Sequence, residues 1–201
     1  MFIYREDITS ILKSLSRGDT ESHEGKEGLL LLIGTVPTVL IGLVFQSTIE
    51  ALFHNLEAVA ISFIITGFLL FATKYFKDGR NLTSFNAFLI GTTQGLAIVP
   101  GISRSGATVS VGIIKGIRGE EAVKFSFLLA IPAIIGAMIV EARNLVQVDY
   151  LVPITVGTII SMIAGYASYK ILVRFVRRKG LYYFSYYCWV IGAITLLYIL
   201  L

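Results

Sequence analysis

Long apolar stretches alternate with short polar segments along the chain. Five stretches are long enough for a membrane-spanning helix, since about 20 residues cross the hydrocarbon core of a bilayer. They cover residues 28–47, 57–76, 120–141, 151–173 and the segment that runs from a tyrosine-rich stretch after residue 182 to residue 201. This pattern predicts an all-α polytopic membrane protein with about five transmembrane helices.

The first 27 residues do not fit the apolar pattern. They are polar and mixed in charge, with basic and acidic side chains interspersed. We therefore expect a polar N-terminal loop or surface helix over residues 1–27, followed by a membrane domain over residues 28–201. No cleavable signal sequence is visible in this stretch.

A sixth apolar segment, residues 85–116, is interrupted by polar residues at its centre. Lysine and arginine concentrate in residues 1–27, 74–84 and 174–182, which predicts that these segments are cytoplasmic. The short links over residues 48–56 and 142–150 are then expected outside. This alternation holds only if residues 85–116 enter and leave the membrane on the same side. About 32 residues are enough for two half-helices that meet at a break. We predict a re-entrant helix-break-helix hairpin.

Composition supports the membrane assignment and limits the classes of function. The chain has 201 residues, of which 55% are hydrophobic and 15% charged, and its mean hydropathy is +0.79. The net charge of +4 comes from basic residues in the short loops, so we expect no nucleic-acid partner. Cys188 is the only cysteine, and neither His23 nor His54 has a partner at metal-ligand spacing.

The polar break within residues 85–116 has the chemistry of an anion site. Pro100 and Gly101 end the first half-helix, and Ser103 and Ser105 are placed to cap the second. Free N–H groups, the positive end of the helix dipole and the Arg104 guanidinium therefore converge, which favours a phosphate. Further donors at the break are expected from residues on its flanks: Thr108, Gly106 and Gln94.

Alternatives remain for the individual side chains. Arg104 would cost about 2.5–3.5 kcal/mol at membrane depth, and it could instead reach the surface or pair with a backbone carbonyl. Gln94 could hold helices together rather than contact a ligand. Serine and threonine hydroxyls often bond back to their own helix, so the signal lies in the whole pattern rather than in one hydroxyl.

That pattern, Pro-Gly-Ile-Ser-Arg-Ser-Gly-Ala-Thr over residues 100–108, resembles the signature of the undecaprenyl-diphosphatase family, the bacitracin-resistance proteins. Gln-Gly-Leu-Ala at 94–97 and Phe-Ser-Phe-Leu-Leu-Ala-Ile-Pro at 125–132 are similar to that family as well. The resemblance implies a cell-membrane enzyme that hydrolyses undecaprenyl diphosphate to the monophosphate and inorganic phosphate, and so recycles the carrier lipid of cell-wall synthesis.

The resemblance also implies roles for residues and a cofactor. Arg104 would clamp the diphosphate, and Ser103 and Ser105 would act with it as catalytic residues. The substrate-binding residues would be Thr108, Gly101, Gly106 and Gln94. A divalent metal, Mg²⁺ or Ca²⁺, would take part, although its ligands are not visible. The partners are then the polyprenyl diphosphate lipid and the membrane, and a homodimer is compatible with the sequence.

One departure from the family leaves other functions open. Family members carry an earlier re-entrant motif with paired glutamates, serines and a histidine, and this sequence shows no counterpart. Glu21, Glu24 and Glu27 are expected to form a solvated face instead. The alternatives are a transporter or flippase of lipid phosphates and a non-catalytic remnant that needs a partner chain. A phosphatase with a histidine nucleophile is disfavoured, because neither histidine lies near the arginine signature.

Overall fold

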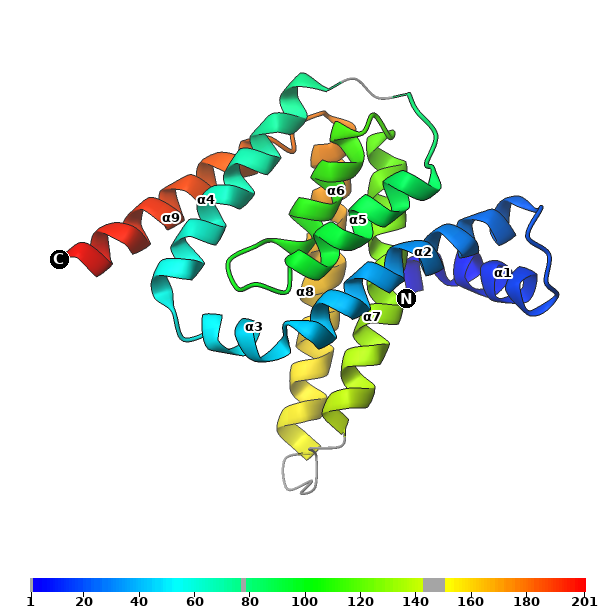
Figure 1. The fold of residues 1–201 in the computed structure, drawn as a ribbon, viewed down its shortest axis with the longest axis horizontal. Coiled ribbons are helices and arrows are strands. Elements are labelled where there is room, and N and C mark those ends of the chain that lie inside the picture. The colour runs from blue at the N-terminus through cyan, green and yellow to red at the C-terminus, as the bar shows by residue number, and fades with distance from the viewer. Residues whose placement is uncertain (1, 77–78, 143–150) are drawn as a thin grey trace.

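Helices make up nearly all of the described structure. The computed structural model describes residues 2–76, 79–142 and 151–201 (Figure 1). Within these residues the element order is η1 (Phe2–Tyr4), α1 (Arg5–Ser16), α2 (His23–Val44), α3 (Gln46–Leu52), α4 (Leu56–Ala72), η2 (Thr73–Tyr75), α5 (Ser84–Leu96), α6 (Arg104–Ile114), α7 (Gly119–Ala142), α8 (Leu151–Arg177) and α9 (Tyr183–Leu200).

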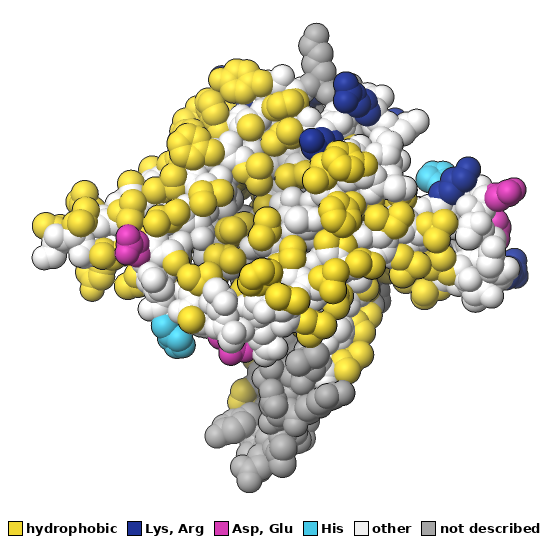
Figure 2. Space-filling model, viewed as in Figure 1, with side chains coloured by type: hydrophobic (Ala, Val, Ile, Leu, Met, Phe, Trp, Pro, Cys, Tyr) yellow, Lys and Arg dark blue, Asp and Glu magenta, His cyan; other side chains and the backbone are white. Residues whose placement is uncertain are grey.

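The five predicted transmembrane helices are confirmed. Helices long and apolar enough to cross a bilayer cover His23–Val44, Leu56–Tyr75, Gly119–Ile139, Pro153–Arg177 and Tyr183–Leu200. The protein is therefore a multi-pass, all-α membrane protein. Many large hydrophobic side chains are exposed, and hydrophobic side chains are spread over the whole face shown in Figure 2, as expected for a protein that faces lipid.

The ends of the elements differ from the sequence-based boundaries in two places. Helix α2 begins at His23, because the Ser22 hydroxyl accepts from the backbone N–H of Gly25 at 3.1 Å and caps the helix. The expected link over residues 48–56 is mostly the short helix α3. Most of the expected link over residues 142–150 lies outside the described residues. The division at residue 27 stays a prediction, since α2 runs across it.

The segment over residues 85–116 is a helix-break-helix hairpin whose two ends meet. The backbone N–H groups of Gly79 and Arg80 both donate to the carbonyl of Gly116, at 2.9 and 2.8 Å. Arg80 also forms a short parallel bridge with Ile117. The chain therefore enters and leaves the hairpin at one place, so it is re-entrant as predicted. Figure 1 shows α5 and α6 side by side with their connecting loop inside the bundle.

Small residues allow α2 to cross the hairpin closely. Gly91 of α5 lies against the backbone of Gly34 in α2, so that a Cβ atom at Gly91 would overlap the Gly34 carbonyl. Thr38 of α2 adds a hydrogen bond, donating its hydroxyl to the carbonyl of Gly91 at 2.8 Å. Helix packing in membranes uses such close backbone contacts because lipid provides no hydrophobic drive for association. The crossing fixes the first half-helix of the hairpin.

The N-terminal segment forms the surface helix α1, which is tied to the bundle. Lys124 of α7 pairs with Asp7 at 2.6 Å and with Glu27 at 3.1 Å. The hydroxyls of Tyr4 and Tyr169 are 2.7 Å apart, and burial together with this hydrogen bond raises the pKa of Tyr4 well above its ordinary value. The expectation that Glu27 lies on a solvated face is therefore wrong. Its side chain is only 14% exposed and pairs with Lys124, which also pairs with Asp7 of α1.

Gly91 provides a test of the close crossing. Replacing Gly91 with Ala should destabilise the folded protein by about 1–3 kcal/mol, because the added methyl group has no space against α2. Gly157→Ala is the matched control, since Gly157 lies in α8 with nothing near its Cβ position. Alanine there should be neutral or slightly stabilising, because it favours helix. Thermal unfolding in detergent measures both variants, and equal midpoints would contradict the crossing.

Candidate functional site

The turn of the hairpin is pressed against α4. Gly101 has a φ of +90°, a conformation that side chains disfavour. A Cβ atom at Gly101 would also lie 2.5 Å from the carbonyl oxygen of Val59 and 2.9 Å from Cβ of Ser62. Glycine is therefore required twice, for the direction of the turn and for its contact with α4. This is the structural reason for the Pro-Gly pair in the motif.

Thr66 of α4 holds the turn through its hydroxyl. Its Oγ1 atom accepts from the backbone N–H of Ser103 at 3.4 Å and donates to the carbonyl of Gly101 at 3.4 Å. The side chain is almost fully buried, with 1% exposure. Sequence reasoning missed Thr66, because a single threonine in an apolar run is typical of any transmembrane helix. Only the fold brings it to the motif.

The second half-helix, α6, begins at the break and leaves donors free. Ser103 caps α6, and its hydroxyl accepts from the backbone N–H of Gly106 at 3.2 Å. A Cβ atom at Gly106 would lie 2.8 Å from this hydroxyl, so the cap itself requires glycine there. The N–H groups of Arg104 and Ser105 have no acceptor within the described residues. Two backbone donors and the positive end of the helix dipole thus remain for a ligand.

Arg104 stands at the same helix start with its charge unbalanced. Its side chain is exposed, and no acidic side chain or carbonyl of residues 2–76, 79–142 or 151–201 bonds to it. Helix α6 has 11 residues, so its start lies about 16 Å from the open end of the hairpin, or roughly half the hydrocarbon thickness. An unpaired guanidinium at that depth calls for an anionic partner. Ser103 and Ser105 flank it at the turn.

Two of the expected substrate-binding side chains are engaged within the bundle. The hydroxyl of Thr108 is buried and donates to the carbonyl of Arg104 at 2.8 Å. The side chain of Gln94 is 1% exposed and donates to the carbonyl of Leu129 in α7 at 3.1 Å. Gln94 also approaches Thr38 of α2 at 3.5 Å. Gln94 thus joins three helices, as the packing alternative predicts, and its role toward a ligand stays a prediction.

The described residues do not gather a metal centre. Nowhere among them do three histidine, cysteine, aspartate or glutamate side chains come together. Cys188 is buried and unpaired with another sulfur. The residues at the break are donors, with hydroxyl, N–H and guanidinium groups, and these suit an anion rather than a cation. The site as described therefore does not fit a metal ion held by protein side chains alone.

The Thr66 clamp can be tested without a ligand. Thr66→Val keeps the shape of the side chain and removes both hydrogen bonds to the turn. Because both bonds are long, we expect a loss of about 0.5–1.5 kcal/mol in unfolding free energy, with faster amide exchange at Ser103. Thr158→Val is the control, since the Thr158 hydroxyl bonds only to Ile154 of its own helix. Unchanged exchange at Ser103 would argue against the clamp.

Comparison with known proteins places this site in a family. Residues 1–194 match the family model described as bacitracin resistance protein BacA. An undecaprenyl-diphosphatase of Carboxydothermus hydrogenoformans is 41% identical, over 98% of this chain and 76% of the relative. One of Alkaliphilus metalliredigens is 36% identical, over 100% of this chain and 79% of the relative. One of Korarchaeum cryptofilum is 38% identical, over 94% and 76%.

The matches run through the whole membrane domain described above. The chain spans about three quarters of the length of these relatives. The re-entrant hairpin, with Arg104 at its break, lies inside the matched region. By the extent of the family match and by these identities, the chain belongs to the bacitracin resistance protein BacA family.

Proposed function

We propose that the protein hydrolyses undecaprenyl diphosphate, or a closely similar polyprenyl diphosphate, to the monophosphate and inorganic phosphate. The reaction breaks the anhydride P–O bond, and water supplies the oxygen and protons that the two products gain. The observation that carries this proposal is the unpaired Arg104 at a helix start inside a membrane protein of this family. It is the chemistry needed to hold a diphosphate at mid-membrane depth.

The geometry assigns a gripping role to the hairpin break. The guanidinium of Arg104 can bond two phosphate oxygens at once, and the N–H groups of Arg104 and Ser105 can bond a third. These donors stabilise the negative charge that develops on the transferred phosphoryl group and the leaving monophosphate. Because the clamp of Thr66 and the cap of Ser103 fix the turn, the donors need little reorganisation when the substrate binds.

The prenyl chain has an apolar surface beside the turn. Leu96 and Ile98 lie at the end of α5 and in the connecting loop, and their side chains are 53% and 38% exposed. A lipid in the bilayer can lay its isoprenoid tail along this surface while its diphosphate meets Arg104. The substrate would then reach the site sideways from the membrane. We infer that the protein acts in the cell membrane, and a homodimer stays a prediction.

The alternatives are not favoured. A transporter of lipid phosphates would also use a broken helix with an arginine, but the relatives in this family are named as diphosphatases. The same names argue against a non-catalytic remnant. Release of inorganic phosphate from the purified protein separates hydrolysis from both. Movement of labelled lipid without such release would favour transport.

Arg104 is the sharpest test of the grip. Arg104→Ala should lower kcat/KM for phosphate release by about 10²–10³-fold, because it removes the charged donors from the transition state. Arg104→Lys should recover only part of the loss, since an ammonium group cannot bond two oxygens in one plane. Arg178→Ala is the charge-matched control, since Arg178 is an exposed arginine in the turn that follows α8. Full activity of Arg104→Ala would contradict the proposal.

Ser103 can be tested as a nucleophile apart from its role as a cap. Ser103→Asn keeps a capping oxygen but removes the hydroxyl. If the hydroxyl attacks phosphorus, Ser103→Asn should lose turnover while substrate binding and the unfolding midpoint stay near those of the wild type. Ser105→Ala gives the same test for the neighbouring hydroxyl. Turnover retained in both variants would place the attacking group elsewhere.

We propose a divalent cation as cofactor, on the family resemblance alone. The described residues form no cluster of three ligands, and Mg²⁺ is commonly bound in part through substrate phosphates. Phosphate release should then stop when EDTA is added and return with Mg²⁺ or Ca²⁺ in excess. Binding of the intact substrate should weaken in parallel. Full activity in EDTA would exclude the cofactor.

A further inference from the structure

A cavity lies at the open end of the hairpin, remote from the break. It has a volume of about 480 Å³ and is lined by residues before and within α5 and after α6: Arg80, Asn81, Thr83, Phe85, Asn86 and Lys115. The 13-residue helix α5 separates it from the turn, which corresponds to about 20 Å. The cavity is therefore a separate feature, at the end of the bundle that the basic residues predict to be cytoplasmic.

Two cations from opposite arms of the hairpin line this cavity. Arg80 precedes α5 and Lys115 follows α6, and the backbone bonds from Gly79 and Arg80 to Gly116 hold the two arms together. Neither cation pairs with an acidic side chain in the described part of the chain, and no acidic residue is among those lining the cavity. Figure 2 shows basic side chains near the top of this face, with the visible acidic side chains elsewhere.

The Asn86 amide is the independent sign of a ligand. Its side chain is 9% exposed and lines the cavity, yet it makes no hydrogen bond to any described residue. The side chain is thus largely covered by its neighbours, and its amide group is left free to bond a ligand in the cavity. The start of α5 adds two more donors, since the Thr83 hydroxyl accepts only from the N–H of Asn86 and leaves those of Ser84 and Phe85 free.

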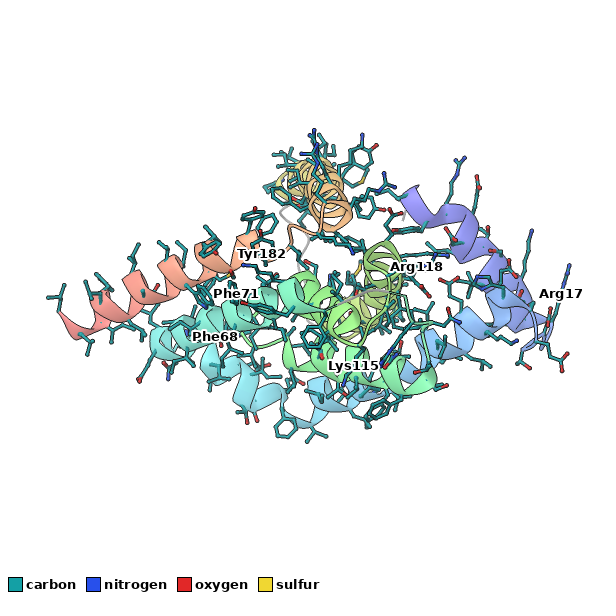
Figure 3. The ribbon with its side chains drawn as sticks, turned by 90° about the horizontal axis from the view of Figure 1, so that it is seen from above. Arg17, Phe68, Phe71, Lys115, Arg118 and Tyr182 are labelled. Atoms are coloured by element: carbon teal, nitrogen blue, oxygen red, sulfur yellow. The ribbon has the colours of Figure 1, made fainter. Side chains whose placement is uncertain are left out.

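A neighbouring cavity shows why the first is distinctive. This second cavity, of about 440 Å³, is also rich in basic residues, but it contains acidic residues that offset them. Arg177 pairs with Glu120 at 3.1 Å, and Arg118 lies 3.7 Å from Glu121. Figure 3 shows Lys115 and Arg118 on different sides of the bundle end. Among the described lining residues, Lys115 and Arg80 thus have no acidic neighbour in their cavity, whereas Arg118 and Arg177 each lie beside a glutamate in theirs.

We propose that the cavity at Arg80, Asn86 and Lys115 binds a phosphate group, either the headgroup phosphate of an anionic membrane lipid or free phosphate. Two cations, a buried amide and the free N–H groups of a helix start are the donor set that a phosphate takes. Phe85 is 65% exposed at the rim and can contact an acyl chain. The site is independent of the hydrolytic break and would dock a lipid at the membrane surface.

The test measures lipid binding to the full chain by native mass spectrometry. Phosphatidylglycerol is the anionic probe and phosphatidylcholine is the zwitterionic comparison. Removing both cations in Arg80→Gln/Lys115→Gln should weaken binding of phosphatidylglycerol about 25-fold, at roughly fivefold for each cation near a membrane surface. Arg178→Gln removes one exposed cation elsewhere at the same end and should leave this binding within about twofold.

Asn86→Asp separates binding from folding. The carboxylate has the same shape as the amide and lies in the first turn of α5, where a negative charge favours the helix dipole. The unfolding midpoint should therefore be unchanged or higher, while phosphatidylglycerol binding falls at least about tenfold through repulsion of the phosphate. If Asn86 had only a structural role, the substitution would not weaken phosphatidylglycerol binding while leaving the unfolding midpoint unchanged.

The source of the phosphate follows from a competition. If inorganic phosphate alone raises the unfolding midpoint of the wild type but not of Asn86→Asp, the ligand is free phosphate. If only phosphatidylglycerol does so, the ligand is a lipid headgroup. The proposal is overturned if Asn86→Asp and the double variant bind both probes like the wild type. It is also overturned if Arg178→Gln weakens binding as much as the cavity variants.

Discussion

The structure depends on satisfying backbone polar groups where the hairpin breaks inside the membrane. Lipid offers no hydrogen bonds, so a break survives only where protein or a ligand supplies them. The Thr66 hydroxyl accepts from the N–H of Ser103 and donates to the carbonyl of Gly101, and the Ser103 hydroxyl accepts from the N–H of Gly106. The N–H groups of Arg104 and Ser105 are left over. The hydrogen bonds that hold the turn therefore leave these two N–H groups unpaired, at a place where a phosphate can bind.

Close packing positions that break. Gly34 and Gly91 bring α2 and α5 into backbone contact, and Gln94 reaches from α5 to α7. The first half-helix is thus held on two sides, while Gly101 brings the turn against α4. None of these contacts relies on hydrophobic burial, which is weak between helices in lipid. Precision in the turn comes instead from small residues and a few hydrogen bonds between helices.

Sequence patterns predicted the spans, the break and the phosphate chemistry, because length, apolar runs and the Pro-Gly pair are local signals. They did not predict contacts made by the fold. In the sequence, Thr66 is one threonine in an apolar helix and Glu27 is one acid in a polar segment. Their partners, the N–H of Ser103 and the ammonium of Lys124, are far away in the chain and come near only in the folded protein. The helix α3 was missed for a related reason, since a short apolar link carries little periodic signal.

The hairpin places two helix starts at opposite ends of one element, and this explains how it can hold anions in two places. Helix α5 starts at the open end beside Arg80 and Lys115, and α6 starts at the turn beside Arg104. Each start carries free N–H groups and the positive end of a dipole. About 20 Å of helix separates them, and two unit charges at that distance interact by only about 0.8 kcal/mol at an effective dielectric constant of about 20. A charge change at one end should therefore alter binding at the other end by no more than about fourfold.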